Sequence, residues 1–438
     1  MAEPLKVGLA GLGTVGTAVI HLLEQGRDKL TSRCGRPIEV VALSARSRSK
    51  KRDIDLKKFR WVADPVALAR DPSIDVFVEV IGGADDPAKL AVETALAAGK
   101  PVVTANKALL ARNGHRLALL AERHRVALNF EASVAGGIPI VKTLREAVNG
   151  NSFTRIYGIL NGTCNYILSR MEQDRLAFDE CLREAQRLGY AEADPTFDVE
   201  GHDTAQKLSI LASLAFGTKV DPDAIYVEGI SSIALADLDA ASELGYRVKL
   251  LGVAVKTEAG IEQRVHPTMV RRDSAIAQVM GVTNAVTVDA DGLAPITLVG
   301  PGAGGMATAS AVVSDIADIA RGVRTPPFGR PAARMTPIRK APMQRHEGGY
   351  YIRLLARDRP GSAATIARRL AQQQISIESI VQRHDRHGRG QSGRSGDPVP
   401  VILITYATSE DAVRKALAAV RRDRVISGRP QVIRIEKN

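Results

Sequence analysis

The chain has 438 residues, so two or three domains are expected, because a single hydrophobic core rarely grows that large. Hydrophobic residues make up 45% and charged residues 25%, which excludes a disordered or fibrous chain on composition. The formal net charge of +12 raises the hypothesis of a nucleic-acid or anionic-membrane partner. Residues 321–438 carry 24 basic and 9 acidic groups, whereas residues 1–320 carry 36 and 39. The excess of positive charge therefore belongs to the C-terminal quarter alone.

The cysteine pattern and the hydropathy bound the cellular context. Cys34, Cys164 and Cys181 form no C-x-x-C pair, which argues against a disulfide framework or a zinc site and fits a reducing compartment. The N-terminus has no signal-peptide pattern, and no stretch approaches the roughly 18 uninterrupted apolar residues of a membrane span. We expect a soluble, cytoplasmic protein with no membrane partner.

Residues 1–150 alternate between strand and helix patterns. Apolar runs predict strands at 7–10, 38–43, 75–81, 102–103 and 127–132, and helical periodicity lies between them, clearest at 87–98 and 105–123. This βαβα order predicts a parallel, doubly wound sheet.

Residues 151–322 show a different mixture, which predicts an α+β domain. The patterns give strands at 153–160, 248–255, 262–265 and 284–288, and helices at 165–171, 178–188, 202–216 and 311–321.

The C-terminal quarter begins with a linker and continues as a small domain. Residues 325–342 are rich in Pro and Arg without apolar periodicity, so the linker is placed at 323–347. Over 348–438 the order is βαββαβ, which is ferredoxin-like: strands at 350–356, 375–382, 399–407 and 432–435, helices at 361–373 and 409–420. The polar loop 384–398 is interpreted as a mobile hairpin tip.

A glycine-rich turn directly follows the first predicted strand. It has the pattern G-x-G-x-x-G and consists of Gly11, Leu12, Gly13, Thr14, Val15 and Gly16. In a Rossmann fold the first glycine makes the tight turn, the second lets the backbone approach a pyrophosphate, and the third lets helix and strand pack closely. The strand–turn–helix context favours dinucleotide binding, with a merely structural turn as the alternative.

The end of the second strand bears on the choice of cofactor. NAD-binding proteins place an acidic residue there, but this chain has the sequence LSARSRSK, with Arg46 at its centre. A guanidinium suits a 2′-phosphate, so NADP is favoured over NAD; a solvated basic loop is the alternative.

Carboxylates and lysines are concentrated in two segments. The stretch GYAEADPTFDVEGHD, residues 189–203, runs into a predicted helix on which Asp203 and Lys207 are four residues apart and share one face. The apolar flanks favour a functional pair over a solvated one, because a lysine on a mostly buried helix can be tuned for proton transfer. Lys107 follows a buried strand, at the edge where parallel sheets bind ligands.

The chain resembles the homoserine dehydrogenase family. The resemblance lies in GLAGLGTVG, TANKALLA, NFEASVAGGIPI, ILNGTCNYIL, GYAEADPTFDVEGHDTAQKLSILA and GPGAGGMATASAVVSDI, in the family's order. The tail resembles an ACT domain, a ligand-sensing βαββαβ module, through its D-x-P-G-x-x-x-x-I-A pattern. Together they resemble the long monofunctional form of the enzyme.

The resemblance implies the reversible, NAD(P)-dependent interconversion of L-homoserine and L-aspartate 4-semialdehyde, in threonine, methionine and isoleucine biosynthesis. It assigns the general acid/base to Lys207, and supporting catalytic roles to Lys107 and Asp203. The implied substrate-binding residues are Glu192, Asp198, Tyr190, Gly162 and Thr163. Lys107 and Gly302 also lie near the cofactor in the family.

The resemblance further implies a sodium ion. Its oxygen ligands would be Glu131 and the carbonyls of Val134, Gly136 and Ile138, which suit a hard cation. From the residues alone, this segment is a strand end followed by a bend.

Several alternatives stay open. Another dehydrogenase of amino-acid metabolism, such as a semialdehyde dehydrogenase, would need an activated cysteine. A nucleic-acid-binding protein would need aromatic residues interleaved with the basic ones, and the tail has few, so no nucleic-acid partner is expected. The ACT-like tail implies L-threonine as an effector, or serves only assembly. We expect a homodimer or homotetramer.

Overall fold

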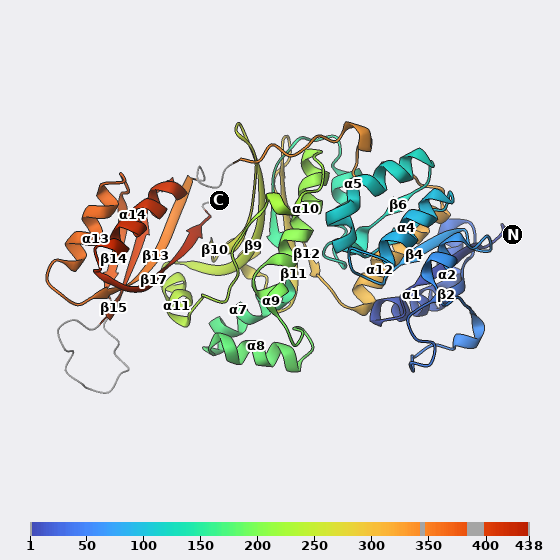
Figure 1. Cartoon of the computed structure of the whole chain (residues 1–438), viewed down its shortest axis with the longest axis horizontal. Helices are drawn as coiled ribbons and strands as arrows, with labels where there is room; N and C mark the ends of the chain where they lie inside the picture. Colours follow the sequence, from blue (N-terminus) through green and yellow to red (C-terminus); the bar gives the residue numbers. More distant parts are fainter. Residues whose placement is uncertain (1, 342–346, 383–397, 437–438) are drawn as a thin grey trace.

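The computed structural model describes residues 2–341, 347–382 and 398–436. Three parts follow one another along the longest axis (Figure 1), with the N-terminal domain in blue at one end and the C-terminal domain in orange and red at the other. In the described ranges, every helix is too short or too polar to cross a bilayer.

The N-terminal domain is a parallel sheet with helices packed against it. The strand order is β3-β2-β1-β4-β5-β6, which is the order of a dinucleotide-binding Rossmann fold and confirms the predicted fold class. Its elements are β1 (Leu5–Ala10), α1 (Thr14–Gln25), α2 (Arg27–Cys34), β2 (Ile38–Ser44), β3 (Arg60–Trp61), α3 (Pro65–Arg70), β4 (Val76–Glu79), α4 (Ala88–Ala97), β5 (Val102–Thr104), α5 (Lys107–Arg123) and β6 (Leu128–Asn129).

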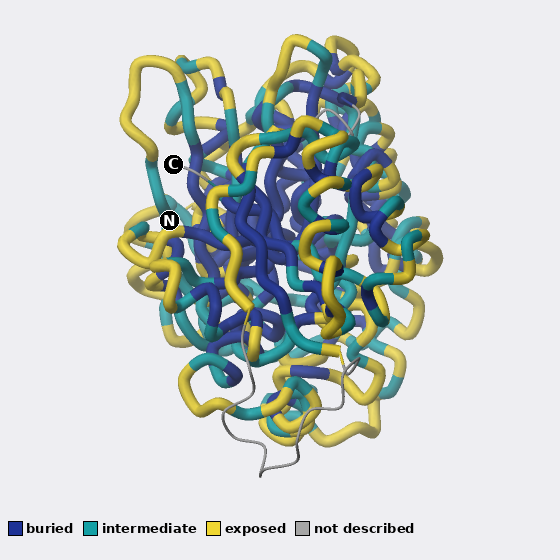
Figure 2. The backbone as a smooth tube through the Cα atoms, turned by 90° about the vertical axis from the view of Figure 1, so that its left-hand side faces the viewer, coloured by how far each residue is buried: buried dark blue, intermediate teal, exposed yellow. Residues whose placement is uncertain are grey.

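The middle domain places helices on one face of an antiparallel sheet. Helices α7, α10 and α11 all pack against β9, which is buried along most of its length. Seen along the long axis from the C-terminal domain, buried backbone lies toward the centre of the molecule and exposed segments lie toward its periphery (Figure 2). The elements are α6 (Ile140–Lys142), β7 (Phe153–Ile159), α7 (Gly162–Asp174), α8 (Phe178–Arg187), α9 (Thr196–Val199), α10 (His202–Phe216), β8 (Tyr226–Val227), α11 (Leu235–Glu243), β9 (Tyr246–Thr257), β10 (Gly260–Arg271), β11 (Thr283–Ala290), β12 (Ile296–Pro301) and α12 (Gly305–Ala320).

The C-terminal domain has the predicted βαββαβ order, but it is not a separate body. Its strands are β13 (Glu347–Arg357), β14 (Ile377–Gln382), β15 (Pro398–Thr405), the short β16 (Thr408–Ser409) and β17 (Ile426–Ile435), and its helices are α13 (Ser362–Ala371) and α14 (Glu410–Arg422). Strand β17 pairs with β13 on one side and runs parallel to β10 on the other. One sheet therefore runs in the order β12-β11-β7-β9-β10-β17-β13-β15-β14 through both domains.

Two segments make contacts beyond the domains predicted for them. Helix α12, which follows the middle-domain strands in the sequence, packs against α1 and contributes to the core of the N-terminal domain. The predicted linker at 323–347 is, over its described part, not a solvated spacer. Thr336 forms a parallel β-bridge with Thr218. Ala332 is fully buried, and its N–H donates to the Glu122 carboxylate at 2.9 Å.

Other differences are local. Residues 127–132, predicted as one strand, form the two-residue β6 and then a 3₁₀ turn at Glu131–Ser133. Helices α2, α3 and α11 were not predicted, because α2 and α11 carry too few long apolar side chains for a clear periodicity and α3 has only six residues. Most of the predicted mobile hairpin tip, residues 384–398, lies outside the described residues.

Phe328 anchors the segment that joins the domains. Its ring is fully buried, 5.1 Å from the Phe130 ring, and a Cβ on Gly114 would lie 3.0 Å from it. Phe328→Ala is expected to lower the free energy of unfolding by about 3–5 kcal/mol, because it removes a large buried ring and leaves a cavity. Urea unfolding measures this, and Val323→Ala, at an exposed position, serves as the control. An equal effect of the two variants would contradict the anchoring role.

Candidate active site

The turn after β1 has the geometry of a phosphate-binding loop. Gly11 has a φ of +105°, and a Cβ there would lie 2.4 Å from the Val80 carbonyl oxygen. A Cβ on Gly16 would lie 2.0 Å from the Gly11 carbonyl oxygen. A Cβ on Gly13 would meet no atom within 4 Å, so open space lies before the N-terminus of α1. The loop can therefore hold a pyrophosphate against the free N–H groups of that helix.

A second glycine-rich loop returns to this turn just before α12. A Cβ on Gly305 would lie 2.8 Å from the Thr14 side chain. Gly302 lies so close to Asn284 that a Cβ would be 2.1 Å from its side chain, and the Gly302 carbonyl oxygen accepts the Gly136 N–H at 2.9 Å. The two glycine-rich loops and the segment of Gly136 thus lie side by side.

The basic loop after β2 is tied to the phosphate turn. Arg46 is exposed, with its side chain free to meet a ligand from solvent. Arg52, which the sequence analysis did not select, donates from Nε to the Leu12 carbonyl oxygen at 3.0 Å and from Nη2 to the Ser47 carbonyl oxygen at 2.8 Å. Arg52 therefore holds the basic loop beside the turn that would carry the cofactor phosphates.

Two lysines from different domains meet at one carboxylate. Asp203 lies in the first turn of α10, and its Oδ1 is 3.1 Å from Nζ of Lys107 at the start of α5. Its Oδ2 is 2.7 Å from Nζ of Lys207, one turn further along α10. Lys207 also donates to the Leu160 carbonyl oxygen at 2.7 Å. Since an ammonium has three N–H donors, one remains for a ligand.

The Asp203–Lys207 pair is buried, which rules out the alternative of a solvated surface pair. Asp203 is 4% and Lys207 8% exposed, whereas the Lys107 side chain is 34% exposed. Burial favours the protonated form of Asp203, but the Lys207 and Lys107 ammonium groups outweigh it and hold the pKa of Asp203 well below its usual range. Asp203 is therefore a fixed negative charge between two cations.

Asn161 connects this cluster to Asp198. Its Nδ2 donates to Asp198 Oδ1 and to Asp203 Oδ2, each at 2.8 Å, while its Oδ1 accepts the Cys164 N–H and caps α7. Burial and the nearby charge of Asp203 raise the pKa of Asp198. The two carboxylates thus share one amide donor, and their pKa values are shifted in opposite directions.

Glu79 and Asn106 set the position of Lys107. The Glu79 carboxylate, fully buried at the end of β4, accepts the Thr104 hydroxyl at 2.6 Å. Asn106 caps α5 with its Oδ1 and donates from Nδ2 to the Gly83 carbonyl oxygen at 2.6 Å. The sequence analysis missed Glu79, although a charged residue inside an apolar strand was the available signal.

A cavity of about 250 Å³ lies between the cluster and the phosphate turn. Its lining includes Val15, Gly82, Lys107, Lys207 and Gly302, so both lysines and both glycine-rich loops border the same space. A larger groove of about 450 Å³ lies between α2 and α12, but no residue of the cluster lines it. The smaller cavity is therefore the candidate active site.

The structure divides the remaining predicted substrate residues into two groups. Thr163 Oγ1 donates to the Tyr190 carbonyl oxygen at 2.6 Å, which joins the loop after α8 to the start of α7 beside Gly162. The Tyr190 side chain packs edge-on against the Tyr166 ring at 5.0 Å, and Glu192 is exposed. Gly162 and Thr163 thus adjoin the cluster through Asn161, whereas the Tyr190 and Glu192 side chains lie on an exposed loop.

The predicted cation loop is a buried turn beside the cavity. The Glu131 carboxylate accepts the N–H groups of Val141 at 2.9 Å and Lys142 at 2.8 Å, and the Ile138 carbonyl oxygen accepts the Ile140 N–H at 2.8 Å. Burial, with the charge of Asp315, raises the pKa of Glu131 to about 7. The oxygen donors suit a hard cation, whose positive charge would offset the cost of the buried, ionised Glu131 carboxylate.

The cysteines offer no activated nucleophile. Burial raises the pKa of Cys34, raises that of Cys164 well above its usual value, and raises that of Cys181 to about 11. A nucleophilic thiol needs a lowered pKa, so the alternative of a cysteine-dependent semialdehyde dehydrogenase has no support at these positions.

Comparisons with known proteins agree with this geometry. The family model for the homoserine dehydrogenase NAD-binding domain matches residues 11–131, the homoserine dehydrogenase model matches 139–317, and the ACT domain model matches 350–422. The chain is 43% identical to the homoserine dehydrogenase of Pseudomonas aeruginosa over 99% of both chains, and 44% identical to that of Neisseria gonorrhoeae over 95% of both.

Solved structures give the same result. A homoserine dehydrogenase from Thiobacillus denitrificans is 42% identical, with a TM-score of 0.91 over 99% of this chain and 98% of that one. A hyperthermophilic archaeal homoserine dehydrogenase, solved in complex with NADPH, is 27% identical, with a TM-score of 0.61 over 72% of this chain and 97% of that one. The chain belongs to the homoserine dehydrogenase family of NAD(P)-dependent oxidoreductases.

Proposed function

We propose that Lys207 is the general acid/base in the interconversion of L-homoserine and L-aspartate 4-semialdehyde. The observation that carries this proposal is the placement of Lys207 at the cavity wall with one N–H donor uncommitted and with Asp203 as its fixed counterion. In the oxidation of homoserine the hydroxyl proton passes to neutral Lys207 Nζ. In the reduction of the semialdehyde the ammonium returns that proton to the developing alkoxide.

The nicotinamide cofactor, when bound, accepts or supplies the hydride, so the residues of the chain need only bind, orient and move a proton. Lys107 supplies a second positive charge to the same cavity and stabilises the developing alkoxide. Asp203 holds both ammonium groups in place. Asp198 and Glu192 are proposed to bind the substrate ammonium, because cations are best recognised by carboxylates; Tyr190, Gly162 and Thr163 would shape the site.

Removal of Lys207 tests the proton-transfer role. Lys207→Ala is expected to lower kcat on the order of 10²- to 10⁴-fold, the usual contribution of a positioned acid/base. The dissociation constant for NADPH, measured by fluorescence titration, should stay within about two- to threefold of the wild-type value, because Lys207 is proposed to act on the substrate and not to bind the cofactor.

Lys256→Ala, at an exposed lysine of β9, is the matched control and should retain normal turnover. If Lys207→Ala kept near-normal kcat, the acid/base assignment would be wrong.

NADP is proposed as the preferred cofactor. Arg46 lies in the basic loop that Arg52 holds against the phosphate turn, and the archaeal relative was solved with NADPH. Arg46→Ala is expected to lower kcat/KM for NADP about 10- to 100-fold, because a hydrogen bond to a charged group contributes about 1.5–3 kcal/mol. The value for NAD should not change.

Initial rates with both cofactors measure this effect, and Lys29→Ala, at an exposed position on α2, is the control. An equal loss for NAD and NADP in Arg46→Ala would refute recognition of the 2′-phosphate.

L-Threonine is proposed as an effector that acts through the ACT domain; a purely assembling role is the second candidate. Arg434 of β17, almost fully buried, contacts Glu228 Oε2 at 2.6 Å. Two residues further on, the Ile230 N–H donates to the Val199 carbonyl oxygen at 2.8 Å, in the loop that enters α10. This chain of contacts supports communication between the ACT domain and the catalytic helix, which effector binding would need.

The test titrates the full-length enzyme with L-threonine. Inhibition together with a rise in Tm is expected, because a ligand that binds the folded state stabilises it. D-Threonine is the control. Glu228→Gln should weaken inhibition while the threonine-induced rise in Tm persists. If L-threonine changed neither the activity nor Tm, the ACT domain would serve only assembly.

A sodium ion held by Glu131, Val134, Gly136 and Ile138 is also proposed, on the oxygen donors and the buried charge described above. No step of the reaction passes through it. Assembly as a homodimer or homotetramer in the cytoplasm completes the proposal.

A further inference from the structure

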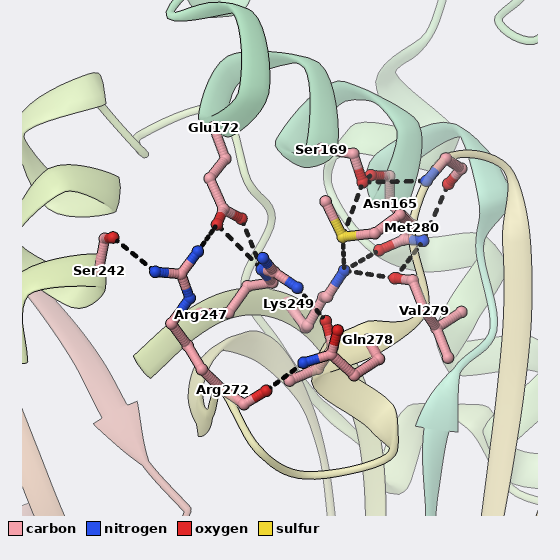
Figure 3. Close-up of polar contacts among 12 residues, drawn as sticks. Asn165, Ser169, Glu172, Ser242, Arg247, Lys249, Arg272, Gln278, Val279 and Met280 are labelled. Carbon is pink, nitrogen blue, oxygen red and sulfur yellow. Dashed lines mark hydrogen bonds and ion pairs between the residues drawn. The ribbon is translucent and has the colours of Figure 1, made fainter. Parts of the chain in front are cut away.

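A second lysine is buried in the middle domain, away from the cavity. Lys249 lies on β9 and is 1% exposed. Its Nζ donates to Asn165 Oδ1 at 2.9 Å, to the Val279 carbonyl oxygen at 2.5 Å and to Met280 Sδ at 3.4 Å (Figure 3). Three acceptors for three N–H donors match a protonated ammonium, because a neutral amine would turn its lone pair toward one of them.

The partners of Lys249 in the described part of the chain are all neutral. The charged groups around it are Arg247 on its own strand, Glu172 on α7 and Arg272 after β10. Glu172 is engaged elsewhere, at 2.8 Å from Arg247 Nε and 3.3 Å from Arg272 Nη2. Burial and the like charge of Arg247 lower the pKa of Lys249 to about 7. Lys249 is therefore buried at a cost, without a carboxylate partner, and its interactions are the hydrogen bonds to these neutral acceptors.

Lys249 determines the orientation of the Asn165 amide. Because the ammonium faces Oδ1, the Nδ2 group must point the other way, toward the turn between Val279 and Thr283. There it donates to the carbonyl oxygens of Gly281 at 2.8 Å and of Val279 and Thr283 at 3.2 Å each. An inverted amide would set its N–H groups against the ammonium and its oxygen against three carbonyl oxygens, so the inverted form is excluded.

The turn that Asn165 holds is the outer support of the substrate loop. A Cβ on Gly162 would lie 2.6 Å from the Val282 carbonyl oxygen, so the two backbones are in direct contact. Asn284, just past the turn, fills the space beside Gly302, which borders the active-site cavity. A shift of this turn would therefore move Gly162, which it touches directly, whereas Gly302 is also held by the Gly136 N–H at 2.9 Å.

We propose that Lys249 is a positioning residue for the homoserine site: through Asn165 it holds the 279–283 turn against the substrate loop at Asn161–Thr163. The proposal rests on the proposed use of that loop in substrate binding. Lys249 touches neither the cavity nor the proton-transfer cluster, so its effect falls on homoserine binding and leaves the cofactor contacts in place.

Lys249→Met removes the ammonium and keeps a long unbranched side chain. The KM for homoserine is expected to rise about tenfold, with kcat lowered less than threefold and the NADPH dissociation constant unchanged; a tenfold change corresponds to about 1.4 kcal/mol. Asn165→Ala should raise the KM for homoserine by a similar factor. The double variant should raise this KM no more than the stronger single variant, because both residues act through one clamp, the Lys249–Asn165 contact that holds the 279–283 turn.

Asn165→Asp separates positioning from stability and does not depend on the folding of Lys249→Met. The carboxylate gives Lys249 a charged partner, and this gain opposes the cost of setting its second oxygen against the three carbonyl oxygens of the turn, so Tm should change little. It cannot donate to the turn, so the KM for homoserine should rise as in Asn165→Ala. Arg247→Met, two residues away on the same strand, is the matched control: it should lower Tm and leave this KM unchanged.

Full-length wild-type enzyme and Lys207→Ala are run in parallel. A wild-type chain that does not oxidise homoserine, or a fully active Lys207→Ala variant, would overturn the proposed function and not the clamp. An unchanged homoserine KM in Asn165→Asp and Asn165→Ala, additive effects in the double variant, or an equal rise in KM with Arg247→Met would each overturn the positioning role.

Discussion

The candidate active site depends on one carboxylate shared by two ammonium groups. Lys107 comes from the N-terminal domain and Lys207 from the middle domain, and without Asp203 their charges would repel each other across the domain boundary. The local structure of α10 suits the position of Asp203. Glycines at 201 and 217, both with positive φ, delimit α10, and Asp203 in its first turn benefits from the helix dipole. The relative position of the two domains is thus part of the catalytic geometry.

Local sequence patterns were sufficient to predict features that lie within a single helix or turn. Residues 202–216 were predicted as a helix with the bounds that α10 has, because the apolar periodicity ends at a glycine. The G-x-G-x-x-G turn was also located from the sequence, and in the structure Gly11 and Gly16 have close backbone contacts while Gly13 faces open space. Lys207 and Asp203 followed from their spacing on that helix.

The rest depends on contacts between residues that are distant in sequence. Nothing in the composition of 323–347 indicates that Phe328 inserts between Phe130 and Gly114, since a single aromatic residue gives no periodicity. Arg52 acts by reaching a backbone carbonyl oxygen, and Asn165 by the direction of its amide. Such polar contacts are set by tertiary packing and leave no pattern along the chain. The sequence therefore indicated that Asp203 and Lys207 lie together, but not which residues hold the surrounding loops in place.

The parallel pairing of β10 with β17 has a consequence for the order of folding. Strand β17 follows the other described strands in the sequence, yet it pairs with β10 at Thr268 and Met269, beyond the residues that pair with β8, and it brings Glu436 to the buried Arg264, at 2.6 Å. During synthesis the middle domain therefore exposes an unpaired strand edge and a guanidinium without this carboxylate until the C-terminal domain is made. Completion of the catalytic sheet is thus coupled to translation of the ACT domain.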